Sequence, residues 1–252
     1  MCRLAAYLGR PRPLASLIYD APHGLERQAY APEMMVNGHV NTDGTAVVWW
    51  HQGRPVRYVT ESPPWSDGEL RRIASTHQAG VMVAAVRTAT PGVGYGVGHV
   101  QPWMVGGYGG VHNGWIEGFT GAAGDELIAA VGSPELLTVH NDSLATVLLA
   151  AQLAGGDPSR GVEMAVGYVD ALVRRHGGMA ALNVGLVAGG SLAVARHAIG
   201  QPHNSLFVLQ DGNGIWVASE PLDGALWREV PESHLVTADG ENLEVRPLEL
   251  RP

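Results

Sequence analysis

Stretches typical of β-strands and stretches typical of α-helices fall into separate blocks along this chain instead of alternating. Regular alternation would predict a parallel sheet, whereas segregation predicts an α+β fold with antiparallel sheets. Thirty-four glycines and sixteen prolines are scattered without a repeat, and they supply the many tight turns that such a fold needs. We find no low-complexity linker, so we expect one domain over residues 1–252.

The first block predicts a series of strands and one helix. A turn at residues 41–44 leads into an expected strand, and residues 51–54 form a hairpin turn after it. Ser66 or Asp67 can cap a helix that continues to about Thr76. The expected strands are residues 4–8, 45–50, 55–59, 81–86 and 108–111.

The second block predicts two helices, after which the chain returns to strands. Asp142 is an expected N-cap for a helix over residues 143–154. Apolar residues recur at helical spacing over residues 160–176, and Gly177 can end that helix. The strongest hairpin signal lies at residues 211–214. The expected strands are residues 182–187, 192–196, 205–209 and 215–218.

Charge and hydropathy restrict the class of protein. Sixteen basic and twenty-four acidic residues give a net charge of −8 without a long run of either sign, which argues against a nucleic-acid or anionic-membrane surface. The N-terminus has no apolar core of signal-peptide length. The most apolar later run, residues 180–195, is interrupted by glycines and is shorter than the roughly 20 residues that a spanning helix needs. We therefore expect a cytoplasmic protein.

Neither the cysteine nor the histidines suggest a metal. Cys2 is the only cysteine, which excludes an internal disulfide and any multi-cysteine metal site. The eleven histidines are dispersed, and no pair has ligand spacing on one helix face. Gly92, Gly94 and Gly96 do not follow a strand and open a helix as a nucleotide-phosphate loop does. We expect neither a metal nor a cofactor.

Cys2 stands where removal of Met1 would make it the N-terminal residue. Its thiol would then lie beside a free α-amine with a pKa of about 8, so one residue can supply both nucleophile and general base. Arg3 would favour the reactive thiolate by its charge. The alternative interpretation is that a cysteine next to the initiator methionine is there by chance and has no catalytic role. Cys2 alone would favour that alternative, and the polar motifs later in the chain favour the nucleophile.

Three further polar groups follow in order along the chain. Arg87 to Thr90 follow an apolar strand, His112 to Gly114 follow the next one, and Asn141 to Ser143 precede a helix. Polar groups at strand ends beside glycines are placed for a site. His112 is more typical of a structural histidine than of a base, and Asp142 would cap a helix in either case.

This order of residues resembles the class II glutamine amidotransferases of the N-terminal nucleophile hydrolase superfamily. The resemblance implies a four-layer αββα sandwich of two antiparallel sheets between helical layers. It also implies that Arg87 holds the α-carboxylate of a glutaminyl or γ-glutamyl group and that Asp142 takes its α-ammonium. Asn113 and Gly114 would form the oxyanion hole. Thr88, Thr90 and His112 are expected to join the substrate-binding set.

Longer motifs resemble one branch of that family, the stand-alone amidohydrolases that remove glutamate from γ-glutamyl-hercynylcysteine sulfoxide in ergothioneine biosynthesis. This branch implies a cysteine amidohydrolase that acts on a linear amide bond of a small-molecule substrate. This chain differs from the usual pattern of the branch after Gly44 and at Leu144, where the branch usually has glutamate. These differences affect the expected specificity for the leaving group and leave the γ-glutamyl-binding residues intact. The matching segments are residues 1–9, 41–44, 86–90, 111–119, 218–223 and 227–231.

Two alternatives stay open at this point, a glutaminase subunit that supplies ammonia to a separate synthase and a catalytically silent member of the fold. The complete set of matched residues argues against the silent protein. The sequence leaves the oligomeric state open, a homo-oligomer included. An aromatic face suits a trimethylammonium group such as that of a hercynyl leaving group. Four tryptophans near the motifs are candidates for that contact: Trp49, Trp50, Trp103 and Trp115.

Overall fold

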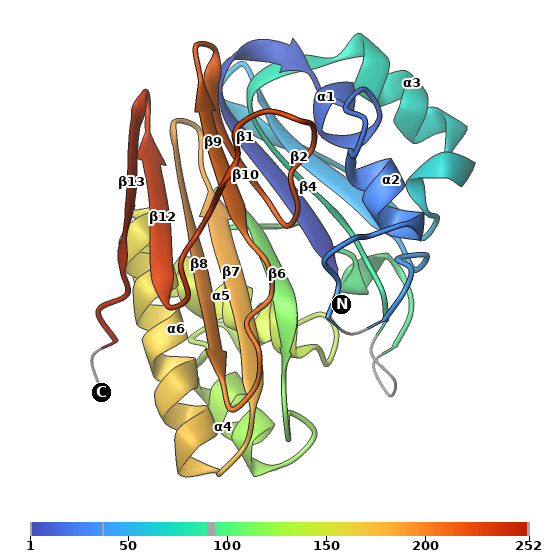
Figure 1. The fold of residues 1–252 in the computed structure, drawn as a ribbon. Helices are drawn as coiled ribbons and strands as arrows, with labels where there is room; N and C mark the ends of the chain where they lie inside the picture. Colours follow the sequence, from blue (N-terminus) through green and yellow to red (C-terminus); the bar gives the residue numbers. More distant parts are fainter. Residues whose placement is uncertain (1, 37, 90–93, 251–252) are drawn as a thin grey trace.

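Two antiparallel sheets stack face to face, and helices cover the outer side of each (Figure 1). The computed structural model describes residues 2–36, 38–89 and 94–250. Its layers run helix, sheet, sheet, helix. Both the antiparallel α+β prediction and the four-layer sandwich implied by the resemblance are therefore confirmed.

The first sheet has the strand that follows Cys2 at its centre. Its order is β11-β9-β10-β1-β4-β2-β3. β1 pairs with β10 on one side and with β4 on the other, where Arg3 lies opposite Val86. Continuing that register places Cys2 opposite Arg87. The strands are β1 (Arg3–Pro13), β2 (Thr45–His51), β3 (Arg54–Thr60), β4 (Gln78–Val86), β9 (Phe207–Asp211), β10 (Gly214–Ala218) and β11 (Arg228–Glu229).

The second sheet contributes the other wall of the sandwich, in the order β13-β12-β8-β7-β6-β5. The connection from β8 to β9, residues 200–206, carries the chain from this sheet to the first. The sequence did not predict β12 and β13. The strands are β5 (Trp103–Val105), β6 (Tyr108–Ile116), β7 (Ala180–Val187), β8 (Ser191–Ile199), β12 (His234–Asp239) and β13 (Asn242–Pro247).

Each sheet has its own helical layer. The first sheet is covered by α1 (Ala15–Ile18), α2 (Leu25–Tyr30) and α3 (Gly68–Thr76), and the second by α4 (Ala122–Ala130), α5 (Asp142–Ala154) and α6 (Pro158–Arg175). Short 3-10 helices are η1 (Pro64–Ser66), η2 (Val97–His99) and η3 (Pro134–Leu136). In the described part of the chain, none of the helices has the length and apolarity to span a membrane.

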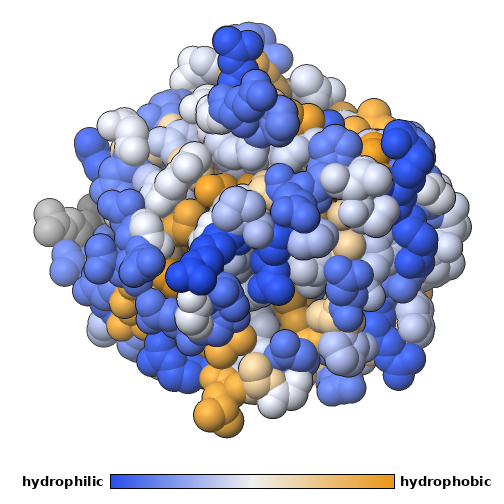
Figure 2. Space-filling model, turned by 90° about the horizontal axis from the view of Figure 1, so that it is seen from above, coloured by the Kyte–Doolittle hydropathy of each residue, from blue (hydrophilic) through white to orange (hydrophobic). Residues whose placement is uncertain are grey.

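Three apolar clusters fill the spaces between the four layers. β1 shows how one strand serves two of them, because successive side chains point to opposite faces. Leu4, Ala6 and Leu8 pack between the sheets, whereas Ala5 and Tyr7 face the helices of the first layer. Strands covered on both faces are apolar throughout, which explains the continuous runs in the sequence. Figure 2 shows one end of the sandwich, where hydrophobic residues form small separate groups among hydrophilic ones.

The structure confirms most predicted elements and corrects two. Asp67 caps α3 by accepting a hydrogen bond of 2.8 Å from the N–H of Leu70, as expected. The cap of α5, however, is Asn141, and Asp142 is the first helical residue. The strand predicted to end at residue 111 continues to Ile116, so residues 112–114 lie within β6 and not beyond its end. They stay in the strand because β7 pairs with them along their length.

Candidate active site

A small pocket at the end of the first sheet, where β1 begins, brings together most of the predicted site residues. Its wall is formed from the first sheet, the second sheet and the start of α5. Thr90 and Met1 lie outside the described residues. The pocket is lined by Cys2, Arg87, Thr88, His99, Gln101, Trp103, Gly114, Asn141, Asp142 and Ser143.

Cys2 is a free, partly exposed thiol at the start of the central strand. The next side chain, Arg3, is completely buried and donates to Glu220 at 3.2 Å. Burial lowers the pKa of Arg3, while attraction to Glu220 and, to a smaller extent, to Cys2 raises it. The main charged partner of Arg3 is therefore the Glu220 carboxylate.

Arg87 leaves β4 and enters the pocket as a buried cation, with 4% of its surface exposed. Its Nη2 donates to the carbonyl of Gly94 at 2.8 Å, and its Nη1 is buried with no partner among the described residues. The backbone of Arg87 is fixed by hydrogen bonds with Asp43 and Gly44. A rigid guanidinium with a donor to spare is suited to bind a carboxylate.

The turn at residues 41–44 therefore supports the segment after β4 that lines the pocket. Thr88 donates its hydroxyl to Oδ1 of Asn41 at 2.9 Å, and the N–H of Ala89 donates to Asp43 at 2.7 Å. His99 lies on the same wall, and burial together with the Arg87 charge lowers its pKa. This wall of the pocket thus combines one buried cation with neutral polar groups.

Asn113 and Gly114 approach the same end from the second sheet. Asn113 is fully buried behind the pocket wall, and its Nδ2 donates to Ser219 Oγ at 3.4 Å. Gly114 lines the pocket, and a Cβ there would lie 1.8 Å from the carbonyl oxygen of Ala181. Only glycine allows this strand to pass so close to β7.

His112 does not line the pocket. It is fully buried, with Nδ1 at 2.8 Å from Ser143 Oγ and Nε2 at 2.9 Å from the carbonyl oxygen of Ala181. The carbonyl can only accept, so Nε2 carries the proton. Burial lowers the pKa of His112 and keeps the ring neutral. This geometry favours a structural histidine that holds Ser143 over direct substrate contact.

Asp142 lies at the N-terminus of α5, where the helix dipole stabilises its negative charge. Its Oδ2 accepts from the N–H of Ile116 and its Oδ1 from the N–H of Ser143, both at 2.8 Å. These bonds join the start of α5 to the end of β6 and fix the carboxylate on the pocket wall. Oδ2 keeps a lone pair that can receive an ammonium group, whereas Oδ1 also lies 3.4 Å from the hydroxyl of Ser143.

Sequence reasoning gave no role to Ser219 and Glu220, which follow β10 and are almost completely buried. Burial alone would raise the pKa of Glu220, but hydrogen bonds from His23 and Glu33 and the charge of Arg3 hold it below its usual value. Ser219 bonds with both β1 and Asn113. A Ser-Glu pair directly after an apolar strand was the available signal.

Two of the four candidate tryptophans lie near the pocket. Trp103 lines it and donates to the carbonyl of Gly98 at 2.9 Å, and Trp115 is partly exposed two residues beyond Asn113. Trp49 packs beneath the first helical layer, and Trp50 packs against the apolar cluster between the two sheets. The structure therefore separates Trp49 and Trp50 from the candidate site.

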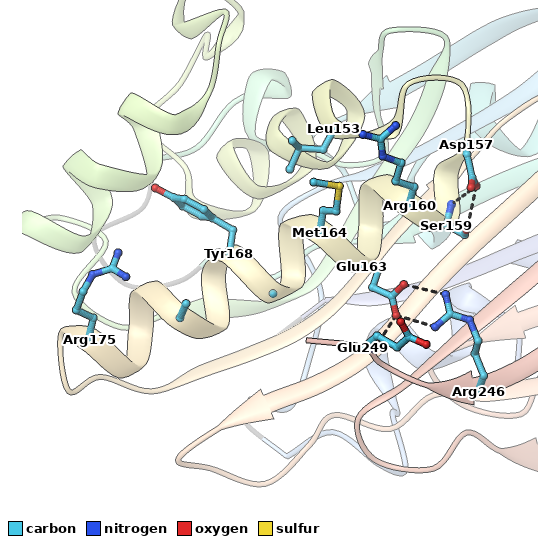
Figure 3. A pocket seen from close by; sticks show the side chains of 12 residues that line it. Leu153, Asp157, Ser159, Arg160, Glu163, Met164, Tyr168, Arg175, Arg246 and Glu249 are labelled. Carbon is cyan, nitrogen blue, oxygen red and sulfur yellow. Dashed lines mark hydrogen bonds and ion pairs between the residues drawn. The ribbon is translucent and has the colours of Figure 1, made fainter. Parts of the chain in front are cut away.

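A larger cavity of about 730 Å³ runs along α6 on the outer side of the second sheet (Figure 3). Glu163 and Arg246 form an ion pair of 2.7 Å across it. The lining contains neither cysteine nor histidine, so we place the chemistry in the smaller pocket. Within the described ranges, no group of three or more histidine, cysteine, aspartate or glutamate side chains could hold a metal ion.

Comparisons with known proteins bear on the family and on the fold of this chain. No protein-family model matches the chain. It is 30% identical over 254 residues to the γ-glutamyl-hercynylcysteine sulfoxide hydrolase of Mycolicibacterium smegmatis, covering 98% of this chain and 100% of that protein. A glutamine aminotransferase class-II domain protein from Silicibacter pomeroyi superposes with a TM-score of 0.73 at 21% identity, over 98% of this chain and 99% of that one. The glutamine phosphoribosylpyrophosphate amidotransferase of B. subtilis superposes with a TM-score of 0.68 at 16% identity, over 99% of this chain and 50% of that one.

Proposed function

We propose that this chain, which belongs to the family of the γ-glutamyl-hercynylcysteine sulfoxide hydrolases, releases glutamate from γ-glutamyl-hercynylcysteine sulfoxide. As a member of that family it is a hydrolase of amide bonds. One observation carries the proposal. The register of β1 on β4 puts the only thiol of the described chain beside a buried arginine that has a free donor, with the Asp142 carboxylate on the same pocket wall.

We assign recognition of the γ-glutamyl group to Arg87 and Asp142. The guanidinium of Arg87 binds the α-carboxylate through Nη1, which has no partner among the described residues, and the carboxylate of Asp142 receives the α-ammonium. Thr88 and Thr90 belong to the same proposed set. Opposite charges at two fixed points on the wall select an amino-acid zwitterion and orient its side chain toward Cys2.

The reaction begins once Met1 has been removed. The α-amine of Cys2 takes the thiol proton through water, and the thiolate sulfur forms a bond to the γ-carbonyl carbon. The C–N bond then breaks as the protonated amine gives its proton to the leaving nitrogen. Water hydrolyses the resulting γ-glutamyl thioester, which releases glutamate and restores the thiol.

The oxyanion that forms during both attacks requires fixed donors. Asn113 Nδ2 carries two hydrogens, of which one is donated to Ser219, and the other is available to the oxyanion. We assign the second donor to the backbone N–H of Gly114. Donors held in place before the reaction are most effective in such a site.

Trp103 and Trp115 are the proposed contacts of the trimethylammonium group, because these two candidates lie near the pocket. Leu144, which replaces the acidic residue typical of the branch, is 3% exposed and packs in the core beneath α5. We further propose that residues 1–252 act as one domain and that the protein is cytoplasmic.

A glutaminase partnered with a separate synthase would use the same γ-glutamyl pocket. Only the leaving-group side discriminates between the two.

The test measures glutamate release from γ-glutamyl-hercynylcysteine sulfoxide and from glutamine in parallel. The protein is first shown by mass spectrometry to begin at Cys2. A kcat/KM at least about 100-fold higher for the sulfoxide supports the proposal, since this corresponds to about 2.7 kcal/mol of discrimination. A preference for glutamine would replace it with the glutaminase. Release from neither substrate by the processed protein would reject both.

A further inference from the structure

Ser219 occupies the junction between the strand that carries the nucleophile and the asparagine proposed for the oxyanion hole. It follows β10 directly and is fully buried. It forms two hydrogen bonds with Leu4, the second residue after Cys2. The N–H of Ser219 donates to the carbonyl of Leu4 at 2.9 Å, and the N–H of Leu4 donates to Ser219 Oγ at 3.0 Å.

The same hydroxyl oxygen accepts from Nδ2 of Asn113 at 3.4 Å. The backbone of Asn113 is held separately, because its carbonyl accepts from Asn204 Nδ2 at 2.9 Å and β6 pairs with β7 at Asn183. The Oδ1 atom of Asn113 is buried and has no hydrogen-bond partner among the described residues. Within the described structure, the orientation of this amide about its last side-chain bond therefore depends on Ser219.

We propose that Ser219 is a positioning residue, which fixes the Asn113 amide so that its second N–H points to the developing oxyanion. The inference rests on the proposed function, in which Asn113 is an oxyanion donor. Because one hydroxyl contacts both β1 and the amide, it sets the position of the donor relative to the nucleophile. Without it, the buried amide is free to rotate and to present Oδ1, an acceptor, where a donor is needed.

The experiment is a double-mutant cycle on processed protein with γ-glutamyl-hercynylcysteine sulfoxide as substrate. We expect Ser219→Ala to lower kcat by about 10- to 100-fold with KM changed less than about threefold, since misplacing a catalytic group by about 1 Å can cost a factor near 100. In the Asn113→Ala background, Ser219→Ala should cause no further loss. Ser16→Ala, which removes a buried hydroxyl in the first helical layer, serves as the matched control.

Each outcome separates the inference from the function on which it rests. If Asn113→Ala lowers kcat but Ser219→Ala does not, or if Ser219→Ala causes the same loss in both backgrounds, the positioning role is wrong and the oxyanion assignment stands. If Asn113→Ala leaves kcat unchanged, the oxyanion assignment fails and the inference fails with it. Thermal unfolding of each variant shows whether a lower kcat results from a destabilised fold. If Ser219→Ala is destabilised, Ser219→Cys is measured instead. Its thiol is a weak donor and acceptor, so it must retain a higher kcat than Ser219→Ala if the positioning role is correct.

Discussion

Oε1 of Glu220 lies 3.2 Å from a guanidinium nitrogen of Arg3, and the two side chains are 1% and 0% exposed. The same carboxylate accepts hydrogen bonds from the N–H groups of Glu33 and Met34. One buried charge therefore joins the start of β1 to the segment that follows α2. Removing one partner of such a pair leaves the other charge buried and uncompensated.

Glu220→Gln should therefore destabilise the protein by about 3 to 5 kcal/mol, measured by urea unfolding at pH 7. The pKa of Glu220 is held below its ordinary value of 4.5, so its contribution is present above pH 4.5 and is lost as the pH falls further. The difference between wild type and variant should accordingly narrow below that pH. Glu69→Gln, at an exposed pair with Arg72, is the control and should leave the midpoint unchanged. An unchanged midpoint for Glu220→Gln would contradict the prediction.

Cys2→Ala should reduce glutamate release to background while leaving the circular dichroism spectrum and the unfolding midpoint unchanged. The thiol is partly exposed, so replacing it with a methyl group should change the free energy of unfolding little. The loss of activity is expected because the proposed nucleophile is removed. Protein that retains Met1 should be equally inactive, because its α-amine is displaced from the thiol. Turnover by Cys2→Ala at more than about 1% of the wild-type rate, a loss of less than about 2.7 kcal/mol, would exclude the nucleophilic role.

Arg87→Lys should raise KM for the γ-glutamyl substrate by about 10- to 100-fold, because charged hydrogen bonds are worth about 1.5 to 3 kcal/mol. A lysine has no planar fork, so it cannot donate to Gly94 and to a substrate carboxylate in the same geometry. Arg54→Lys is the matched control, because it makes the same substitution at an exposed position in β3 and should leave KM unchanged. Steady-state kinetics that give the same KM for both variants would refute the assignment of Arg87.

Buried His112 should make the folded state sensitive to acid. Burial lowers its pKa below the ordinary value of 6.5, so the unfolded chain binds a proton that the folded ring does not. The stabilising difference is present above pH 6.5 and is lost as the pH falls below it, with a limiting slope of about 1.4 kcal/mol per pH unit. His112→Gln should unfold with a weaker pH dependence between pH 7 and 5, and an identical profile would disprove this.

The sequence predicted the parts of the fold that depend on local pattern and missed those decided by neighbours. Apolar runs identified the core strands, but β12 and β13 contain charged residues because they lie toward one side of their sheet. Asn141 and Asp142 are both residue types that often cap helices, so the sequence does not distinguish them. In the structure the side chain of Asp142 accepts a hydrogen bond from Ile116, and the side chain of Asn141 caps α5 by accepting one from Leu144.

The candidate site shows the same division. Cys2 and Arg87 could be found because their types and order are informative, and the pocket does contain both. The sequence does not show that both ring nitrogens of His112 form hydrogen bonds, one with Ser143 and one with Ala181. Partners contributed by segments more than 200 residues away, such as Ser219 for Leu4, have no local signature.

The pairing of β1 with β10, in which Ala5 lies opposite Ala218, joins segments that leave the ribosome at very different times. At about 5 to 20 residues per second, the first strand waits on the order of 10 to 40 seconds for its partner. During that interval the nascent chain exposes its thiol without Ser219 or Glu220 beside it. The pocket is thus completed only after residue 220 has been synthesised, and a chain terminated before that point would carry the proposed nucleophile without the buried side chains that surround it in the folded protein.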